Sequence, residues 1–259
     1  MGINKGFIKE REIISILNKQ IFKNLNSDFK IKIMKVFEGN INPEDELKCS
    51  KQEGLNLEKK SDLTLEVKNK KIYISVKIGK NNSLHEESID SFINFLKSKK
   101  KISKDNIDLI YKFHWCDGTT DNRGSFSNRQ IKSEFKKKNN NQYSTYISTL
   151  RNYKKEIFTR VMLGTVNQPD YLLYFENFEN KIPHFIKMSD LLQDHIAEER
   201  KEDHIGIFRL QNCNACLKGQ DHGHKNHKCV EGCPKIERRT KKHRNDIQFK
   251  IIDIQSNIL

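Results

Sequence analysis

The chain has 259 residues, enough for one large domain or for one domain that carries a small module. It contains 48 Lys and Arg against 34 Asp and Glu, a formal net charge of +14, so we expect a polyanionic partner, most commonly nucleic acid. There is no stretch of about 18 consecutive apolar residues, and the N-terminal segment is charged, so neither a membrane span nor a secretory signal is expected. We therefore predict a cytoplasmic protein without membrane contact, whose six Cys residues are available for metal rather than disulfides.

Two apolar patterns mark the N-terminal part of the chain. Residues 3–25 are expected to form an amphipathic helix, since one face would carry apolar side chains at helical spacing. These are Ile3, Phe7, Ile14, Leu17, Ile21 and Leu25. Glu10 lies within that face, so we expect its carboxylate to form an ion pair with a Lys or Arg, to lie at the core margin or to bind a cation. Residues 29–37 alternate in polarity and predict a β-strand, followed by a polar loop over residues 38–60.

Two β-runs then predict a hairpin. The runs are residues 63–68 and 71–77. The two residues between them, Asn69 and Lys70, make a connection of the length that hairpins favour. If these two residues form the turn, antiparallel pairing places Asp62 beside Lys77 at the open end of the hairpin.

The open end of this hairpin carries chemically suitable side chains. Because side chains alternate along a strand, Ser75 and Lys77 share one face, opposite the apolar face of the same strand. The carboxylate of Asp62 can hold a hard divalent cation such as Mg²⁺. The ammonium of Lys77 can orient or deprotonate an attacking water and offset charge that develops on a phosphate.

This pattern resembles the motif of the PD-(D/E)xK nuclease superfamily, to which many restriction endonucleases belong. Ser61-Asp62 takes the place of the first part of the motif, with Ser61 in the position of Pro. Ser75-Val76-Lys77 takes the place of the second part, with Ser75 in the position of the second acid. The resemblance implies that Asp62 holds a catalytic Mg²⁺, that Ser75 lines the site and that Lys77 positions the attacking water. It also implies that Glu10, as a carboxylate of the first helix, completes the metal shell.

A second placement of the motif is open. Glu66-Val67-Lys68 is also an acid-x-Lys sequence, and Glu44 or Asp45 upstream could supply the paired acid. The placement at Asp62 is preferred, because a hairpin brings its residues together without closure of a long loop.

The order of the elements predicts the fold. Over roughly the first hundred residues we expect helix, strand, hairpin and helix in turn, the last helix covering residues 83–97 behind a capping box of Ser83 and Glu86. This order is that of the superfamily core, so we predict an α/β fold with a restriction-endonuclease-like mixed β-sheet flanked by helices. The later strands, expected to complete the same sheet, are residues 171–176, 182–187, 205–210 and 246–254. Residues 1–259 would then form a single nuclease domain.

Residues 103–163 are expected to be a mostly helical, DNA-contacting region. Ser103 is a predicted N-cap, and a Gly-, Asp- and Asn-rich loop follows at residues 115–124. Within this loop, Asn122 and Arg123 are candidates for contacts with base edges or phosphates. An ordinary polar connector is the alternative.

A small zinc-binding insertion is predicted at residues 211–245. Its four Cys residues, grouped as two close pairs, are Cys213, Cys216, Cys229 and Cys233. Two such pairs fit tetrahedral Zn²⁺, and four thiolates leave no open position, so the zinc is expected to be structural. One of the His residues between the pairs could replace a Cys ligand. A basic run follows, and its Arg238, Arg239, Lys241 and Lys242 are candidates for nucleic-acid contacts.

These patterns together favour a Mg²⁺-dependent type II restriction endonuclease with a structural Zn²⁺. The resemblance implies cleavage of double-stranded DNA at a specific sequence, commonly by a homodimer, and a cognate DNA methyltransferase in the same system. Two alternatives stay open. One is a non-catalytic zinc-containing protein that binds DNA or RNA, and the other is a nuclease directed at RNA or at a nucleic-acid structure.

Overall fold

The computed structural model describes residues 5–52, 60–79, 83–124, 128–176, 178–180, 182–197, 204–211 and 246–251. These residues form two compact units, which are described separately. The sheet unit contains the described residues up to residue 79 and those of 157–194, and the helical unit contains those of 83–156 and 195–251. None of the helices in these ranges is long and apolar enough to cross a membrane.

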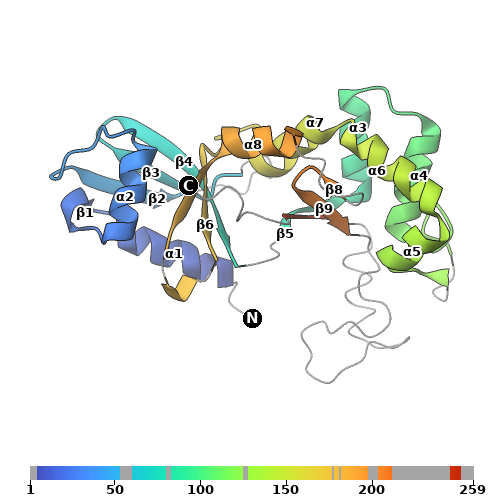
Figure 1. The fold of residues 1–259 in the computed structure, drawn as a ribbon, viewed down its shortest axis with the longest axis horizontal. Coiled ribbons are helices and arrows are strands. Elements are labelled where there is room, and N and C mark those ends of the chain that lie inside the picture. The colour runs from blue at the N-terminus through green and yellow to red at the C-terminus, as the bar shows by residue number, and fades with distance from the viewer. Residues whose placement is uncertain are drawn as a thin grey trace, which may run out of the picture. The chain divides into compact units, whose positions relative to one another are not determined.

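The sheet unit is built on a six-stranded sheet with the strand order β1-β2-β3-β4-β6-β7. Strands β1 to β4 and β6 are labelled in Figure 1. Strands β4 and β6 run parallel, and the other neighbouring pairs are antiparallel, so the sheet is mixed. The strands are β1 (Gln20–Ile21), β2 (Glu46–Lys51), β3 (Leu63–Val67), β4 (Lys70–Ile78), β6 (Tyr171–Phe175) and β7 (His184–Lys187). The parallel pair needs a crossover, and the chain between β4 and β6 includes most of the helical unit.

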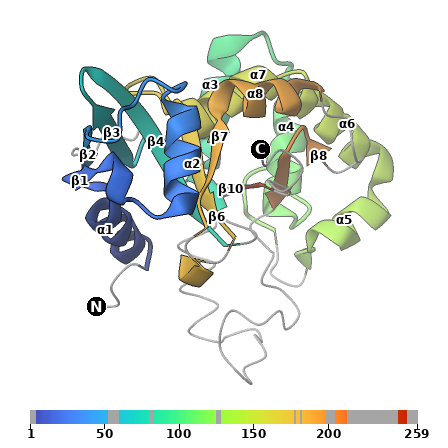
Figure 2. The ribbon, with the colours of Figure 1, turned by 60° about the vertical axis from the view of Figure 1, so that its left-hand side comes forward.

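Helices α1 (Lys5–Leu17) and α2 (Ser27–Val36) pack on this sheet and share one hydrophobic core with it. In α1 the side chains of Ile13 and Leu17 are fully buried in that core. Figure 2 shows α2 beside β7, with which it is in contact. The predicted first helix is therefore confirmed, but it ends before Lys19, whose φ of 57° lies in the left-handed region. Strand β1 and a 3₁₀ turn, Phe22–Asn24, follow it.

The strand predicted over residues 29–37 is wrong, because this segment is helix α2. Asn26 caps the helix by accepting a hydrogen bond from the Phe29 N–H at 2.9 Å. The buried residues are Phe29, Ile33 and Val36, which have helical spacing, whereas Ile31 is 57% exposed. Strand β2 was also not predicted, and it lies within the predicted polar loop.

The helical unit combines a four-stranded sheet with four helices (Figure 1). Its helices are α3 (Ile89–Lys99), α4 (Lys104–Trp115), α5 (Lys132–Lys138) and α6 (Asn140–Arg151). Its antiparallel strands follow the order β5-β10-β9-β8, with β5 (Ser83–Ser88), β8 (His204–Ile205), β9 (Phe208–Gln211) and β10 (Asp246–Ile251). Aromatic packing joins α4, α5 and α6, since Phe113 stacks on Tyr146 with ring centroids 4.2 Å apart and meets Phe135 edge-on.

The remaining helical elements are α7 (Lys154–Phe158), a π-helical turn (Thr159–Leu163), a 3₁₀ turn (Phe178–Asn180) and α8 (Met188–Ala197).

Several sequence-based expectations are corrected in the helical unit. Of the four later strands expected to complete the first sheet, β6 and β7 do so, whereas β9 and β10 form the second sheet together with β5 and β8. The segment predicted as a helix from Ser83 begins as strand β5, and the helix starts later, where Ser88 accepts the Ser91 N–H. The predicted cap at Ser103 is confirmed, since its hydroxyl accepts the Asn106 N–H at 3.2 Å. The predicted zinc insertion falls between β9 and β10 and, apart from Gln211, lies outside the described residues.

Candidate functional site

The hairpin predicted from the sequence is present, with a shifted register. Val67 pairs with Lys70, so the turn consists of Lys68 and Asn69, one residue earlier than expected. Lys68 adopts a φ of 54°, which lies in the left-handed region. The two-residue turns that hairpins favour require such a positive φ at their first residue. The shift moves Asp62 along β4, so that it meets Ser75 instead of lying beside Lys77.

Asp62 precedes β3 and connects three strands. Its Oδ2 atom accepts hydrogen bonds from the Ser75 hydroxyl at 3.1 Å and from the Val76 N–H at 2.6 Å, both on β4. Its backbone N–H donates to the carbonyl of Ile74, and its carbonyl accepts the N–H of Gln52 at the end of β2. Both side-chain bonds use the same oxygen, and Oδ1 has no hydrogen-bond partner within the described part of the chain. The carboxylate is therefore held in one orientation with one oxygen left open.

Ser75 and Lys77 occupy alternate positions of β4 and so project from the same face of the strand. Ser75 is 5% exposed, and Lys77 is half-buried. In the parallel pairing with β6, Ser75 lies opposite Leu172 and Lys77 opposite Tyr174. Two residues of a strand span about 6.6 Å, so the Lys77 backbone lies one such step beyond the serine that holds Asp62.

Glu10 is paired with a lysine. Its Oε2 lies 2.9 Å from Nζ of Lys51, the last residue of β2, and the Glu10 side chain is 19% exposed. Lys51 pairs in register with Leu63, which belongs to the core beneath α1. The expectation of an ion pair with a nearby lysine is thus confirmed. A role for Glu10 as a metal ligand stays a prediction.

The residues of the alternative motif placement meet differently. Asp45 contacts Lys68 at 2.9 Å, while Glu66 lies 4.0 Å from Lys48. The Asn42 N–H donates to Asp45, and this bond together with the Lys68 ammonium lowers the pKa of the Asp45 carboxyl. The acid and the lysine of Glu66-Val67-Lys68 therefore have separate partners. Across the ranges that the structure describes, no three His, Cys, Asp or Glu side chains gather as a metal-binding group.

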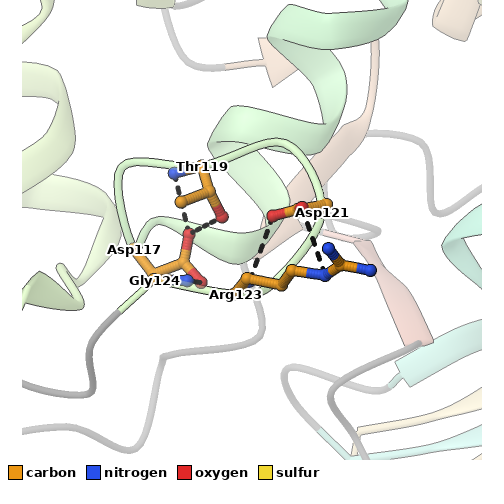
Figure 3. A network of polar contacts seen from close by, with 5 residues as sticks. All are labelled: Asp117, Thr119, Asp121, Arg123 and Gly124. Atoms are coloured by element: carbon orange, nitrogen blue, oxygen red, sulfur yellow. Dashed lines mark hydrogen bonds and ion pairs between the residues drawn. The ribbon is translucent and has the colours of Figure 1, made fainter.

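The loop after α4 is organised by a buried carboxylate (Figure 3). Asp117 is 1% exposed, and its Oδ1 accepts the N–H and the hydroxyl of Thr119 at 2.9 and 2.7 Å. Its Oδ2 accepts the Gly124 N–H at 3.2 Å. A Cβ at Gly124 would lie 2.4 Å from the Asp117 carbonyl oxygen, so this position requires glycine. This organising role was not anticipated, although an Asp followed by Gly and Thr is a usual signal for a side-chain-stabilised turn.

The two loop residues predicted to contact nucleic acid lie at the tip of this loop. Arg123 is 86% exposed, and Asp121 accepts its backbone N–H at 3.2 Å and lies 3.4 Å from its Nε. Asn122 has a φ of 62°, and its Oδ1 accepts a hydrogen bond from Nη2 of Arg129 at 3.5 Å. The structure thus presents Arg123 to solvent and partly engages Asn122 within the loop.

The remaining predicted site residues lie outside the described residues. They are the zinc candidates Cys213, Cys216, Cys229 and Cys233, and the basic candidates Arg238, Arg239, Lys241 and Lys242.

Comparison with known proteins gives a match among solved structures. No family model matches the chain, and no curated protein matches it. Among solved structures, the chain is similar to a crystal structure of the restriction endonuclease MspI in complex with its cognate DNA. The match has a TM-score of 0.57 and 16% sequence identity, and it covers 94% of this chain and 88% of that one. The mixed sheet flanked by helices therefore has a restriction-endonuclease-like α/β fold.

Proposed function

We propose that this protein is a Mg²⁺-dependent type II restriction endonuclease, a phosphodiester hydrolase of the PD-(D/E)xK kind that cuts double-stranded DNA at a specific sequence. The observation that carries the proposal is the contact of Asp62 with Ser75, with Lys77 on the same face of β4. The fold supports it, since a solved structure with a similar fold is a restriction endonuclease in complex with its cognate DNA. The net charge of +14 favours a polyanionic substrate.

The residues at Asp62 fit a magnesium ion that keeps most of its water. Mg²⁺ prefers oxygen ligands and is usually held by one or two carboxylates. Asp62 offers Oδ1, while its bonds to Ser75 and Val76 fix the direction in which that oxygen points. When bound, the ion would supply positive charge that activates water and stabilises the developing phosphate charge.

The protein's own groups then have distinct roles. Asp62 provides the negative charge, and the Ser75 hydroxyl orients it where the family motif has a second acid. Lys77 would hold or accept a proton of the attacking water and offset charge on the phosphate. Glu10 would complete the shell through Oε1, since its Oε2 lies beside Lys51.

We further propose a structural Zn²⁺ held by the four cysteines of the insertion, with the basic run from Arg238 to Lys242 contacting DNA backbone. Measurement of bound zinc tests this directly. The purified protein should contain about one zinc, as expected for a Cys₄ site. A Cys213→Ser variant should lose it. Retention of zinc in that variant would point to a ligand set that includes a histidine.

The proposal includes a homodimer and a cognate DNA methyltransferase, because duplex sites are often two-fold symmetric and a host must protect its own sites. The deciding experiment incubates the protein with methylated and unmethylated plasmid and phage DNA, in Mg²⁺ or in EDTA. Discrete Mg²⁺-dependent fragments that disappear in Lys77→Ala are expected. Cutting that survives in Lys77→Ala but is lost in Lys68→Ala would transfer the site to the alternative placement.

A second candidate is a non-catalytic, zinc-containing protein that binds DNA or RNA. It is favoured by Ser75 in the place of the second acid and by the lack of a three-ligand cluster in the described ranges. Salt-sensitive binding without cleavage of any DNA or RNA substrate would support it.

A further inference from the structure

The loop 117–124 is pre-organised to present one side chain. Three hydrogen bonds to the buried carboxylate of Asp117 fold the loop, and Gly124 can approach it because it has no Cβ. The loop base is closed by a hydrogen bond from the Gln130 N–H to the Cys116 carbonyl at 2.8 Å. A loop folded in this way loses little conformational entropy when it binds a ligand.

At the tip of this loop, Asp121 orients Arg123. The carboxylate lies beside Nε of the guanidinium, at 3.4 Å, and accepts the arginine's own backbone N–H. Figure 3 shows the two terminal nitrogens of Arg123 on the side away from Asp117. With Nε occupied, the two Nη groups remain as a planar pair of donors. Such a pair matches the O6 and N7 acceptors of guanine in the major groove.

We propose that loop 117–124 reads a guanine in the major groove of duplex DNA through Arg123, with Asp121 and Asp117 as positioning residues. This inference rests on the proposed function and specifies how the substrate sequence is read. An oriented guanidinium can pair with two acceptors of a phosphate or of a guanine edge, but only the guanine edge carries sequence information. A rigid loop and an orienting carboxylate favour the directional contact, the base edge.

The surrounding sequence fits the same partner. The last turn of α5 carries Lys136, Lys137 and Lys138, of which Lys137 and Lys138 are exposed, whereas Arg129 is buried. Duplex DNA offers phosphates along both strands next to every base edge. Basic side chains near a base-reading loop would therefore fix its register on the duplex without reading sequence.

The test is selection of bound sequences from a duplex library with randomised positions, with Ca²⁺ in place of Mg²⁺, followed by sequencing. The variants are Arg123→Ala, the charge-conserving Arg123→Lys and Asp121→Asn. The matched control is Lys97→Ala, which removes one exposed charge from α3 in the same unit. In Arg123→Ala we expect the preference for guanine at one position to fall by about 10- to 100-fold. We expect smaller losses in Arg123→Lys and Asp121→Asn, and none in Lys97→Ala.

The outcomes separate the base-reading role from the proposed function. If Arg123→Ala selects the same sequence as the unmodified protein and binds it more weakly at every salt concentration, Arg123 contacts phosphate and the base-reading role is overturned. If the unmodified protein selects and cuts a defined sequence, the proposed function stands whatever the loop variants do. If it neither selects nor cuts duplex DNA, both proposals fail.

Discussion

Two aspartates, one in each unit, use their carboxylates in different ways. In the helical unit, Asp117 is buried and both of its oxygens accept hydrogen bonds. His195 in the same unit is fully buried, and both of its ring nitrogens are engaged, Nε2 with the Lys154 carbonyl and Nδ1 with the Ile207 N–H. In the sheet unit, Asp62 accepts hydrogen bonds through Oδ2, and its Oδ1 accepts none from the described residues.

The difference separates structural polar groups from a group that retains binding capacity. A buried polar group with all its partners inside the protein stabilises the fold and has nothing left for a ligand. A carboxylate that is oriented through one oxygen can still accept a proton or a cation through the other. On this comparison Asp62 keeps an oxygen for the proposed chemistry, whereas Asp117 and His195 support the fold.

The largest expected effect is the loss of cleavage in Asp62→Asn. The amide oxygen can still accept the bonds from Ser75 and Val76, so we expect the fold to persist while the negative charge is lost. Mg²⁺-dependent cleavage should fall by at least about 100-fold, the scale seen when a key electrostatic group is removed. Cleavage rates on plasmid DNA measure this. The control is Asp170→Asn, since Asp170 likewise accepts a backbone N–H, that of Tyr73, and should be dispensable for cutting.

The next effect is a pH dependence of stability set by His195. Burial lowers its pKa to about 4, below the ordinary value near 6.5, although the hydrogen bond to the Lys154 carbonyl opposes part of this shift. The unfolded chain therefore binds a proton at a higher pH than the folded chain. Stability is complete above about pH 6.5 and falls as the pH drops towards 4, by up to about 3 kcal/mol. Urea unfolding between pH 7.5 and pH 4.5 should show this slope, and His195→Gln should flatten it. An equal slope in the variant would assign the effect to other groups.

Asp117→Asn should lower the stability of the fold, whereas Asp62→Asn should lower cleavage and leave the fold intact. Both oxygens of Asp117 face donors, so an amide would place its own N–H₂ group against the N–H of Thr119 or of Gly124. We expect a loss of about 1–3 kcal/mol in the free energy of unfolding, the cost of an unsatisfied buried group. Urea midpoints of both Asn variants make the comparison directly. Equal stability of Asp117→Asn and Asp62→Asn would contradict the assignment of Asp117 as a supporting carboxylate and Asp62 as a functional one.

The sequence predicted the hairpin because two β-runs with a two-residue connection are a local signal. It did not predict the register, since neither Lys68-Asn69 nor Asn69-Lys70 contains the glycine that marks a preferred turn. The shift decides the site, because it is Ser75 rather than Lys77 that meets Asp62.

The predictions for other elements were wrong for different physical reasons. Residues 29–37 alternate in sequence yet fold as α2, where the cap at Asn26 and the burial of residues at helical spacing outweigh the alternation. Strand β2 has only Leu47 and Cys49 as buried apolar residues, too few to distinguish it from a loop. The second sheet pairs β5 with β10, a long-range contact that no local pattern encodes.

The smallest expected effects come from two variants that each remove a hydroxyl group bonded to one of the two carboxylates. Ser75→Ala removes a hydroxyl bond to Asp62, and Thr119→Ala removes one to Asp117. Each should cost about 1 kcal/mol of unfolding free energy, as expected for a single hydrogen bond. Only Ser75→Ala should also slow cleavage, by less than about tenfold, since the Val76 N–H still orients Asp62. A loss in Ser75→Ala as large as that in Asp62→Asn would mean that the hydroxyl itself acts in the reaction, in the place that the family gives to a second acid.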